Sequence, residues 1–259
     1  MFTEVAMIKK VVLVVFFILV IFICVMALQN DPGSIIAKLP AEPFKEGATT
    51  LYYRVYLFGV LPVGDAVIED SGIKKIDKKN LYCLKARAKS SSLVSKIYPF
   101  EVSLESFLDQ ATMLPVSFLQ KIKTKQKELA KEVSYDQKNN IMQILEVKRS
   151  ILPETYEPLS AIWKLRTIDF SLQKEVELNI NTNQKNYTLA VAATQAHLRL
   201  KGLTTPIVRL KSKIFRRDKN PYHQSKVDII FMDNPNKTPI YIKVFASGML
   251  ITVRLTDIR

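Results

Sequence analysis

Apolar and polar residues alternate at every second position along most of this 259-residue chain after residue 50. The alternation begins in LYYRVYLF (51–58) and is still present in MLITVRL (249–255). Successive side chains of a strand point to opposite faces of a sheet, so this period is typical of β-strands. The pattern therefore predicts a fold that is mainly β.

Turn-forming sequences such as DQKNN, NTNQKN and DNPNKTP separate these runs. After a first strand at 51–58 and a second that includes Ala66 and Ile68, further runs lie at 81–89, 100–109, 115–126, 128–136, 141–148, 175–182, 186–194, 205–214, 226–233, 240–246 and 249–255. This spacing predicts an antiparallel sheet of about a dozen strands, rich in hairpins. Gly59 and Gly64 favour a turn or a close backbone approach between the first two strands.

Two segments, 91–99 and 158–166, space their apolar residues at three and four positions and are predicted to be short helices. Pro158 suits the first turn of the second helix. A sheet this long must cover its apolar face by curling into a barrel or half-barrel, or by packing as a sandwich. The fold class expected is a curved antiparallel sheet with two short helices, and the helix around Trp163 is the natural cover for the inner face.

The N-terminal region carries an uncharged apolar run from Val11 to Leu28. Eighteen helical residues span about 27 Å, close to the thickness of a bilayer's hydrocarbon core. Because the run is longer than a typical signal core, we favour an uncleaved single-pass anchor over a signal peptide. Lys9 and Lys10 place the N-terminus in the cytoplasm. Residues 1–28 are then the inner-membrane segment, 29–49 a linker, and 50–259 a domain in the periplasm or outside.

The two cysteines limit how the protein is held and stabilised. Cys24 follows an apolar run, as a lipid-modified cysteine does, but Ile23 stands where that processing signal requires a small residue. Cys83 is the only cysteine of the predicted exported part, so no disulfide forms within it. Stability must come from the hydrophobic core.

The formal net charge of +14 belongs to the exported domain. On that side of a membrane a basic protein meets anionic lipids or wall polymers, and not nucleic acid. In three strands the cations recur at period two and so project from one face. The candidate anion-binding residues are Lys85, Arg87, Lys89, Lys121, Lys123, Lys125, Lys127, Arg209, Lys211 and Lys213. The alternative is that these lysines serve solubility and protect sheet edges.

The residues between the cations form an apolar face. If the sheet closes tightly, these side chains fill a core; if it stays open, they line a groove for an acyl chain or another hydrophobic ligand. The candidate ligand-binding residues are Tyr53, Val55, Leu57, Leu84, Phe118, Ile122, Leu210 and Ile229. The sequence leaves both possibilities open.

No catalytic arrangement is evident in the sequence. His197 and His223 lie in unrelated contexts without neighbouring ligands at metal-binding spacing. Glu101 and Glu105 share a strand face but lie about 13 Å apart by strand rise, too far for a usual catalytic carboxylate pair. We therefore expect a protein that is not an enzyme and has no metal or cofactor.

Several segments carry a family resemblance by their order: LYYRVYLFG with VGDAVI (51–68), YPFEVSLESFLD (98–109) with MLP after it, PLSAIWKLR (158–166) and DIIFMDNPNKTPIYI (228–242). Together they resemble the bacterial family labelled domain of unknown function 3108, over residues 50–256. The resemblance implies an exported, β-rich envelope domain behind a signal or anchor, and brings no known active residues. This chain differs in its many lysines and in Phe231, where the family often has tryptophan.

The residue types also predict a partly buried ion pair between Glu105, in an apolar strand, and Arg166, at the end of the second helix.

The function expected is that of a membrane-anchored, non-enzymatic envelope protein that binds or carries an amphipathic or lipidic component. The alternative is a structural or assembly partner that docks another envelope protein or an anionic wall polymer through its basic strand faces.

Overall fold

The computed structural model describes residues 49–76, 78–182, 184–200, 203–217, 225–246 and 248–259. The predicted anchor (1–28) and all but the last residue of the predicted linker (29–49) lie outside this part. Within it, neither helix has the length and apolar character needed to cross a bilayer.

The described residues form one sheet with two short helices. Its strands are β1 (Thr49–Leu57), β2 (Leu61–Ile76), β3 (Lys79–Ser90), β4 (Phe100–Asp109), β5 (Pro115–Thr124), β6 (Glu128–Asp136), β7 (Ile141–Ile144), β8 (Val147–Ser150), β9 (Thr155–Tyr156), β10 (Glu175–Thr182), β11 (Lys185–Leu200), β12 (Leu203–Arg216), β13 (Ser225–Met232), β14 (Pro239–Ala246) and β15 (Met249–Ile258). The helices are α2 (Ser92–Ser95) and α3 (Pro158–Arg166).

The sheet is two meanders joined at β1 and β15. Strands β1 to β8 pair in chain order, β15 pairs with β1, and β14 to β9 complete the order on the other side. The pairing is antiparallel, apart from the short parallel contact of β9 with β10. The two edge strands, β8 and β9, are thus neighbours in sequence.

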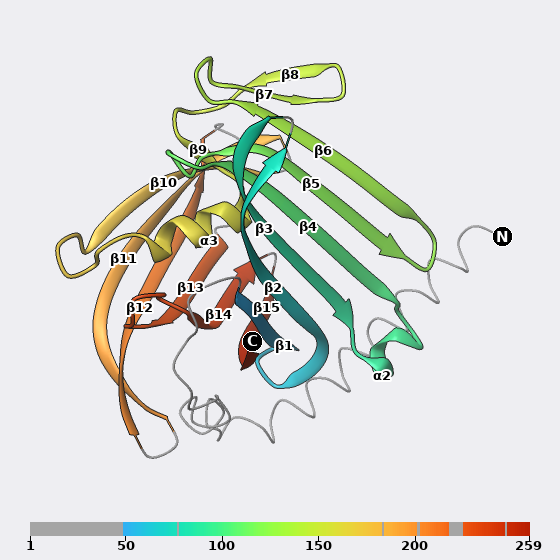
Figure 1. The fold of residues 1–259 in the computed structure, drawn as a ribbon. Helices are drawn as coiled ribbons and strands as arrows, with labels where there is room; N and C mark the ends of the chain where they lie inside the picture. Colours follow the sequence, from blue (N-terminus) through green and yellow to red (C-terminus); the bar gives the residue numbers. More distant parts are fainter. Residues whose placement is uncertain (1–48, 77, 183, 201–202, 218–224, 247) are drawn as a thin grey trace.

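This order forces the sheet to curl. Edge strand β8 ends at Ser150, and edge strand β9 begins at Thr155. The five residue-to-residue steps of chain between these two positions span at most about 18 Å. A flat sheet of fifteen strands would instead separate its edges by about 65 Å. The sheet therefore wraps around a concave face, as Figure 1 shows, which confirms the predicted curved antiparallel sheet.

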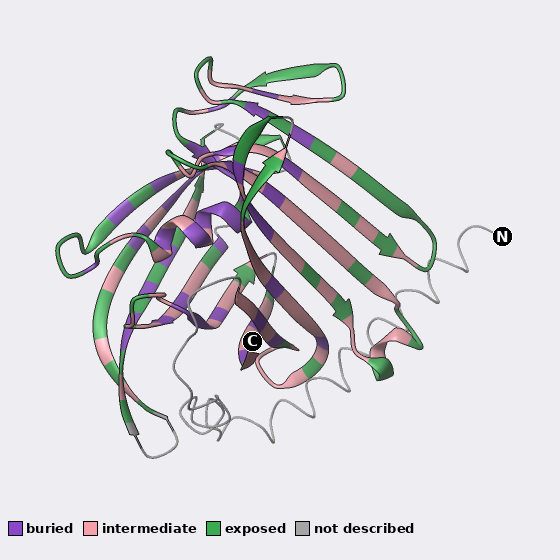
Figure 2. Ribbon diagram, in the orientation of Figure 1, coloured by how far each residue is buried: buried purple, intermediate pink, exposed green. Residues whose placement is uncertain are grey.

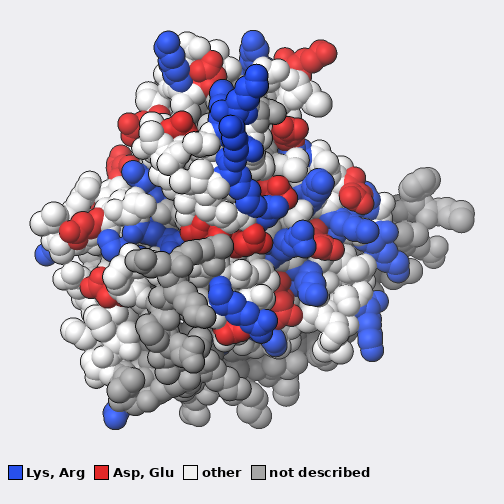
Figure 3. Space-filling view, in the orientation of Figure 1, with Lys and Arg blue, Asp and Glu red and all other residues white. Residues whose placement is uncertain are grey.

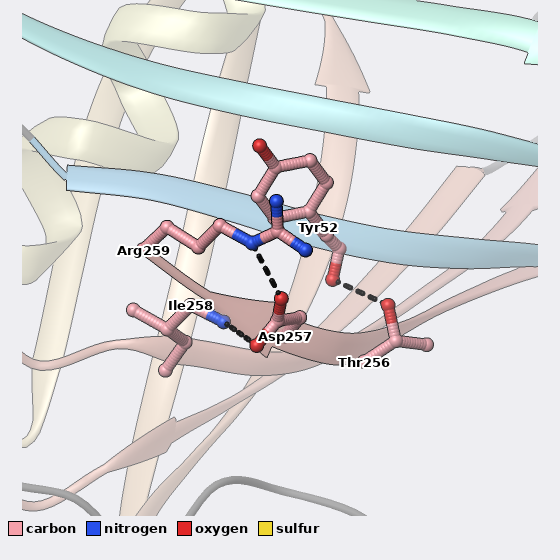
Figure 4. A network of polar contacts seen from close by, with 5 residues as sticks. All are labelled: Tyr52, Thr256, Asp257, Ile258 and Arg259. Atoms are coloured by element: carbon pink, nitrogen blue, oxygen red, sulfur yellow. Dashed lines mark hydrogen bonds and ion pairs between the residues drawn. The ribbon is translucent and has the colours of Figure 1, made fainter.

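The junction of β1 and β15 is secured by contacts near the end of the chain (Figure 4). The backbones of Thr50 and Arg259 exchange two hydrogen bonds, of 2.7 and 2.9 Å. The Arg259 side chain pairs with Asp257 at 2.9 Å and lies 5.0 Å from the ring centroid of Tyr52. Thr256 Oγ1 donates to the carbonyl oxygen of Tyr52 at 3.0 Å. These contacts link β1 to β15, the first and last described strands along the chain.

The two glycines of the first hairpin occupy a turn and a close backbone approach, as their residue type predicts. Gly59 has a φ of 78° in the turn between β1 and β2. A Cβ atom on Gly64 would lie 2.4 Å from the carbonyl oxygen of Lys89 on β3. A larger residue at this point would push β2 and β3 apart.

Helix α3 occupies the concave face (Figures 1 and 2). Leu159 and Trp163 pack into a cluster built mainly from β1–β4, β14 and β15. Ala161 and Leu165, on another side of the helix, pack into a second cluster built mainly from β10–β14. The helix is buried on several sides because both halves of the curled sheet contact it. The prediction that the helix around Trp163 covers the inner face is confirmed.

Side-chain hydrogen bonds join the two edges of the sheet, and within the residues that the structure describes β8 and β9 form no strand ladder with each other. We call the junction between β8 and β9–β11 the seam. Arg149 Nε donates to Gln184 Oε1 at 2.9 Å, and Asn186 Nδ2 donates to the carbonyl oxygen of Ser150 at 3.1 Å. Asn179 Nδ2 donates to the carbonyl oxygen of Pro153 at 2.8 Å. The barrel is thus closed here by contacts that can open more easily than a ladder of backbone hydrogen bonds.

Two local predictions were inaccurate, and one short strand was not predicted. The run at 141–148 is two short strands around a turn at Leu145, which has a φ of 53°. The predicted helix at 91–99 forms only the four residues of α2. β9 was not predicted, because a two-residue strand carries no periodicity.

Candidate functional site

The eight predicted ligand-binding residues share the inner face of the sheet, as the register shows. Leu51, Tyr53 and Val55 alternate with outward residues on β1, and Leu84, Phe118, Leu210 and Ile229 fall on inward rows of their strands. Tyr53, Leu84, Phe118, Leu210 and Ile229 are buried in the hydrophobic clusters, whereas Val55, Leu57 and Ile122 are half-buried. Five of the eight residues therefore pack as core, four of them in the two clusters that include α3, and the role of the set in binding stays a prediction.

Tyr53 illustrates this packing. Its hydroxyl donates to the carbonyl oxygen of Pro239 at 2.9 Å inside the barrel. Burial raises the pKa of the Tyr53 hydroxyl, which therefore stays protonated at neutral pH. The polar end of this side chain is occupied by the fold itself.

A buried carboxyl group begins α3. Glu157 is the N-cap residue and is 1% exposed. Its carboxylate accepts hydrogen bonds from Ser106 Oγ of β4 at 2.7 Å, from the Leu159 backbone N–H at 2.7 Å and from the Ser160 backbone N–H at 2.6 Å. Burial raises the pKa of Glu157, and these donors oppose the rise without cancelling it. Glu157 thus ties the helix to the sheet.

Beside Glu157 lies a cavity of about 160 Å³. It lies where β4–β6 face β10 across the start of α3. Leu104, Phe118 and Val133 give it an apolar wall, and its polar lining is Gln120, Lys131, Tyr135, Glu157, Asn181 and Thr182. A cavity of this size can hold a benzene-sized group.

Lys131 is the cation of this cavity. On β6 it shares the inward row with Val133 and Tyr135, and it lies opposite Gln120 of β5. No ion pair within the described residues includes Lys131. Burial lowers its pKa, because the charged form loses hydration there. Lys131 is half-buried, and its ammonium loses part of its hydration beside the apolar residues of this row.

The sequence analysis did not identify Lys131 and Glu157 as candidate site residues, although the sequence around each has a feature that could have indicated it. In ELAKEVSYD the residues Leu129, Lys131, Val133 and Tyr135 share one face, so the lysine interrupts an apolar row. Glu157 immediately precedes Pro158, at the position of a helix N-cap. The sequence could not show that strands β4–β6 and β10 place these residues around one cavity.

The C-terminal end of α3 holds a second polar cluster. Arg166 Nε and Nη2 donate to the carbonyl oxygen of Asn236 at 2.9 and 2.7 Å, and its guanidinium lies 3.9 Å from the Trp163 ring centroid. Tyr82 donates to Asp70, and burial with this hydrogen bond raises the pKa of Tyr82 to about 12. The cluster fastens α3 to the β13–β14 turn.

The predicted ion pair between Glu105 and Arg166 is wrong. Glu105 lies on the outer face of β4 and pairs with Lys85 of β3 at 3.5 Å. The inward neighbour, Ser106, is the residue that reaches α3. Adjacent strand residues point to opposite faces, so Glu105 could not meet a helix on the concave side.

We therefore expect Glu105→Ala to cost only about 0.2–1 kcal/mol, as cross-strand pairs at partly exposed sites do. A double-mutant cycle with Lys85→Ala, followed by urea unfolding, measures the pair. A loss of several kcal/mol for Glu105→Ala alone would show that this carboxylate is buried against a partner.

The predicted anion-binding rows are interleaved with carboxylates from neighbouring strands. One row across β1–β6 alternates in sign at every strand: Arg54, Asp65, Lys89, Glu101, Lys123 and Glu128. Lys211 likewise lies opposite Asp228, and Lys85 lies between Glu69 and Glu105. On the face of the molecule that Figure 3 shows, acidic and basic side chains are intermixed. Strand register therefore brings carboxylates between many of the predicted anion-binding cations, which lowers the net charge of this face.

Some of the predicted cations have no carboxylate directly opposite. Arg87 and Lys121 lie on either side of Ser103, Arg209 faces Thr194 and Ile230, and Lys213 lies beside Lys226. Lys125 and Lys127 are exposed at the β5–β6 turn. Anion binding by these residues stays a prediction.

Comparison with known proteins supports the fold and the family. The model of the family described as "Protein of unknown function (DUF3108)" matches residues 52–249. No curated protein matches the sequence significantly.

Among solved structures, a beta-barrel-like protein of domain of unknown function DUF1849 from Brucella abortus is similar, with a TM-score of 0.57 and 12% identity. The match covers 83% of this chain and 98% of that one. A candidate lipoprotein from Parabacteroides distasonis (TM-score 0.33, 8% identity, 82% and 95% covered) and a candidate exported protein with a YmcC-like fold from Bacteroides fragilis (0.30, 10%, 84% and 97%) are more distant. The first similarity supports the barrel-like fold.

Proposed function

Since the chain belongs to the family of unknown function DUF3108, no known activity transfers to it, and we propose a function from the interior of its barrel. The protein is a non-enzymatic envelope protein, anchored by its N-terminal segment, that binds an amphipathic molecule with an acidic head group. Lys131 carries the proposal, because it is a cation that lines a partly apolar cavity.

The cavity supplies both kinds of contact that such a ligand needs. Leu104, Phe118 and Val133 can contact methylene groups, and the Lys131 ammonium can pair with a carboxylate or phosphate. A cavity of about 160 Å³ takes one end of an amphipathic molecule. The rest extends toward the seam, where side-chain hydrogen bonds hold the two edges of the sheet.

The other groups of the cavity support this assignment of roles. Both oxygens of Glu157 already accept hydrogen bonds from Ser106 and the start of α3. Asn181 Nδ2 donates to Asn186 Oδ1 at 2.8 Å. Lys131 is therefore the group best placed to bind an acidic ligand, and pairing with an acid would offset the hydration that its ammonium loses on burial.

A titration with a dansyl-labelled fatty acid tests this function, with the full chain held in amphipol. We expect Lys131→Met to weaken binding at least about tenfold, because a hydrogen bond to a charged group contributes about 1.5–3 kcal/mol. The matched control is Lys121→Met, which removes an outward lysine of the adjacent strand β5. The corresponding fatty alcohol should bind both variants alike.

Equal affinity of the wild type and Lys131→Met for the fatty acid would refute the assigned site. The alternative function, an assembly partner with a solid core, would then be preferred. Its supporting observation is that most of the inner face is packed against α3.

A further inference from the structure

The connection between β3 and β4 presents apolar side chains to solvent. Leu93, Ile97 and Tyr98 are 73%, 81% and 61% exposed, and we call these three residues the α2 patch. None of the residues of helix α2 is buried. In Figure 1, α2 projects from the end of the β3–β4 hairpin. These side chains protrude from the molecule and contribute little to its core.

A polar hollow lies directly beside the α2 patch. It has a volume of about 760 Å³ and is lined by the segment that carries the patch, by the ends of β3–β5 and by Asp65. Lys89, Lys123 and Lys125 line it, together with the hydroxyl-bearing residues Ser91, Ser92 and Ser95. Ammonium and hydroxyl groups are the donors that phosphate oxygens accept from.

Two carboxylates in the hollow do not reverse its charge. Asp65 pairs with Arg54 at 2.6 Å. Glu101 lies between Lys89 and Lys123 in the register of β3–β5. Lys96 adds a further cation within the connection that carries the patch. The surroundings of the α2 patch are therefore basic overall.

We propose that the α2 patch and the adjacent hollow dock on the surface of an anionic phospholipid bilayer. The apolar side chains enter the interfacial region, and the lysines and serines bind phosphate groups of the lipids, as in other amphipathic membrane contacts. Three protruding side chains are far fewer than the roughly 20–30 residues on each side of a standard protein interface. The predicted N-terminal anchor would keep this surface near a membrane.

Hydrogen exchange of the full chain in nanodiscs tests this docking. Nanodiscs of phosphatidylcholine alone are compared with nanodiscs that also contain phosphatidylglycerol. We expect exchange of residues 91–99 to slow at least about fivefold in the anionic discs, which corresponds to the attraction of one lysine to an anionic surface. High salt should remove this protection.

A triple variant, Leu93→Ser/Ile97→Ser/Tyr98→Ser, should lose the protection without a change in melting temperature, because all three side chains are exposed. The matched control is Leu172→Ser, which alters an 86% exposed leucine in the loop before β10 and should leave protection of 91–99 intact. Equal exchange in both discs, or protection that survives the triple variant, would overturn the proposal. Protection that appears only after envelope proteins are added would overturn it in favour of a protein partner.

Discussion

Replacement of Trp163 by alanine is expected to lower the free energy of unfolding by about 3–5 kcal/mol, the usual cost of truncating a large buried aromatic residue. Trp163 is 4% exposed and lies on the helix that both halves of the sheet enclose. Its ring also stacks with the Arg166 guanidinium, and its Nε1 donates to the Tyr82 hydroxyl at 3.5 Å. Urea unfolding of the full chain in detergent, followed by circular dichroism, measures the loss.

Two control variants isolate the packing of the ring. Trp163→Phe keeps an aromatic ring in the same space and should cost clearly less than alanine, whereas Leu172→Ala changes an exposed leucine and should cost little. A loss below about 1 kcal/mol for Trp163→Ala would contradict the conclusion that α3 fills the concave face.

Replacement of Glu157 by alanine is expected to cost about 3 kcal/mol, because it removes an N-cap and leaves buried donors without an acceptor. The stranded donors are the Ser106 hydroxyl and the backbone N–H groups of Leu159 and Ser160. Chemical denaturation gives the free energy. Ser106→Ala, which removes a single donor, should cost about 1 kcal/mol and serves as the milder test. A Glu157→Ala protein as stable as the wild type would show that the carboxylate does not hold the helix.

The same residue should give stability a defined dependence on pH. Burial raises the pKa of Glu157 in the folded state, so the folded protein holds this proton to a higher pH than the unfolded chain does. The stabilisation that the protonated Glu157 side chain gives the folded protein is therefore fully present below the pKa of Glu157 in the unfolded chain. It is lost as the pH rises through the pKa of Glu157 in the folded protein. Relative to Glu157→Gln, which cannot ionise, the wild type should therefore lose stability with rising pH. A relative gain with rising pH would show that the three donors outweigh burial.

Sequence periodicity predicted most of the sheet, because each strand has one buried and one exposed face, and its apolar and polar residues alternate accordingly. The runs at 100–109, 128–136 and 175–182, and the helix at 158–166, agree with the structure at both ends. The segment around α2 was less predictable, since its apolar residues are spaced as in a helix but lie exposed. The curling of the sheet followed from its length, but the contact of its two edges depends on strand order, which periodicity does not contain.

The candidate site was much less predictable than the fold. Alternation within each strand predicted the inward rows of apolar residues. The strand register of the structure confirms that these rows share one face of the sheet. Charge balance on the outer face depends on the neighbouring strand: Lys89 meets both Asp65 and Glu101 only in the assembled sheet. Lys131 and Glu157 are 26 positions apart in the sequence, and only the folded chain brings them to one cavity.

The most direct test of the proposed function is native mass spectrometry of the full chain, released gently from the envelope of the cells that express it. The wild type and Lys121→Met should carry the same acidic amphipathic molecule, and Lys131→Met should be free of it. A wild-type protein without bound ligand, or a Lys131→Met protein that retains the ligand, would contradict a binding site at the Lys131 cavity.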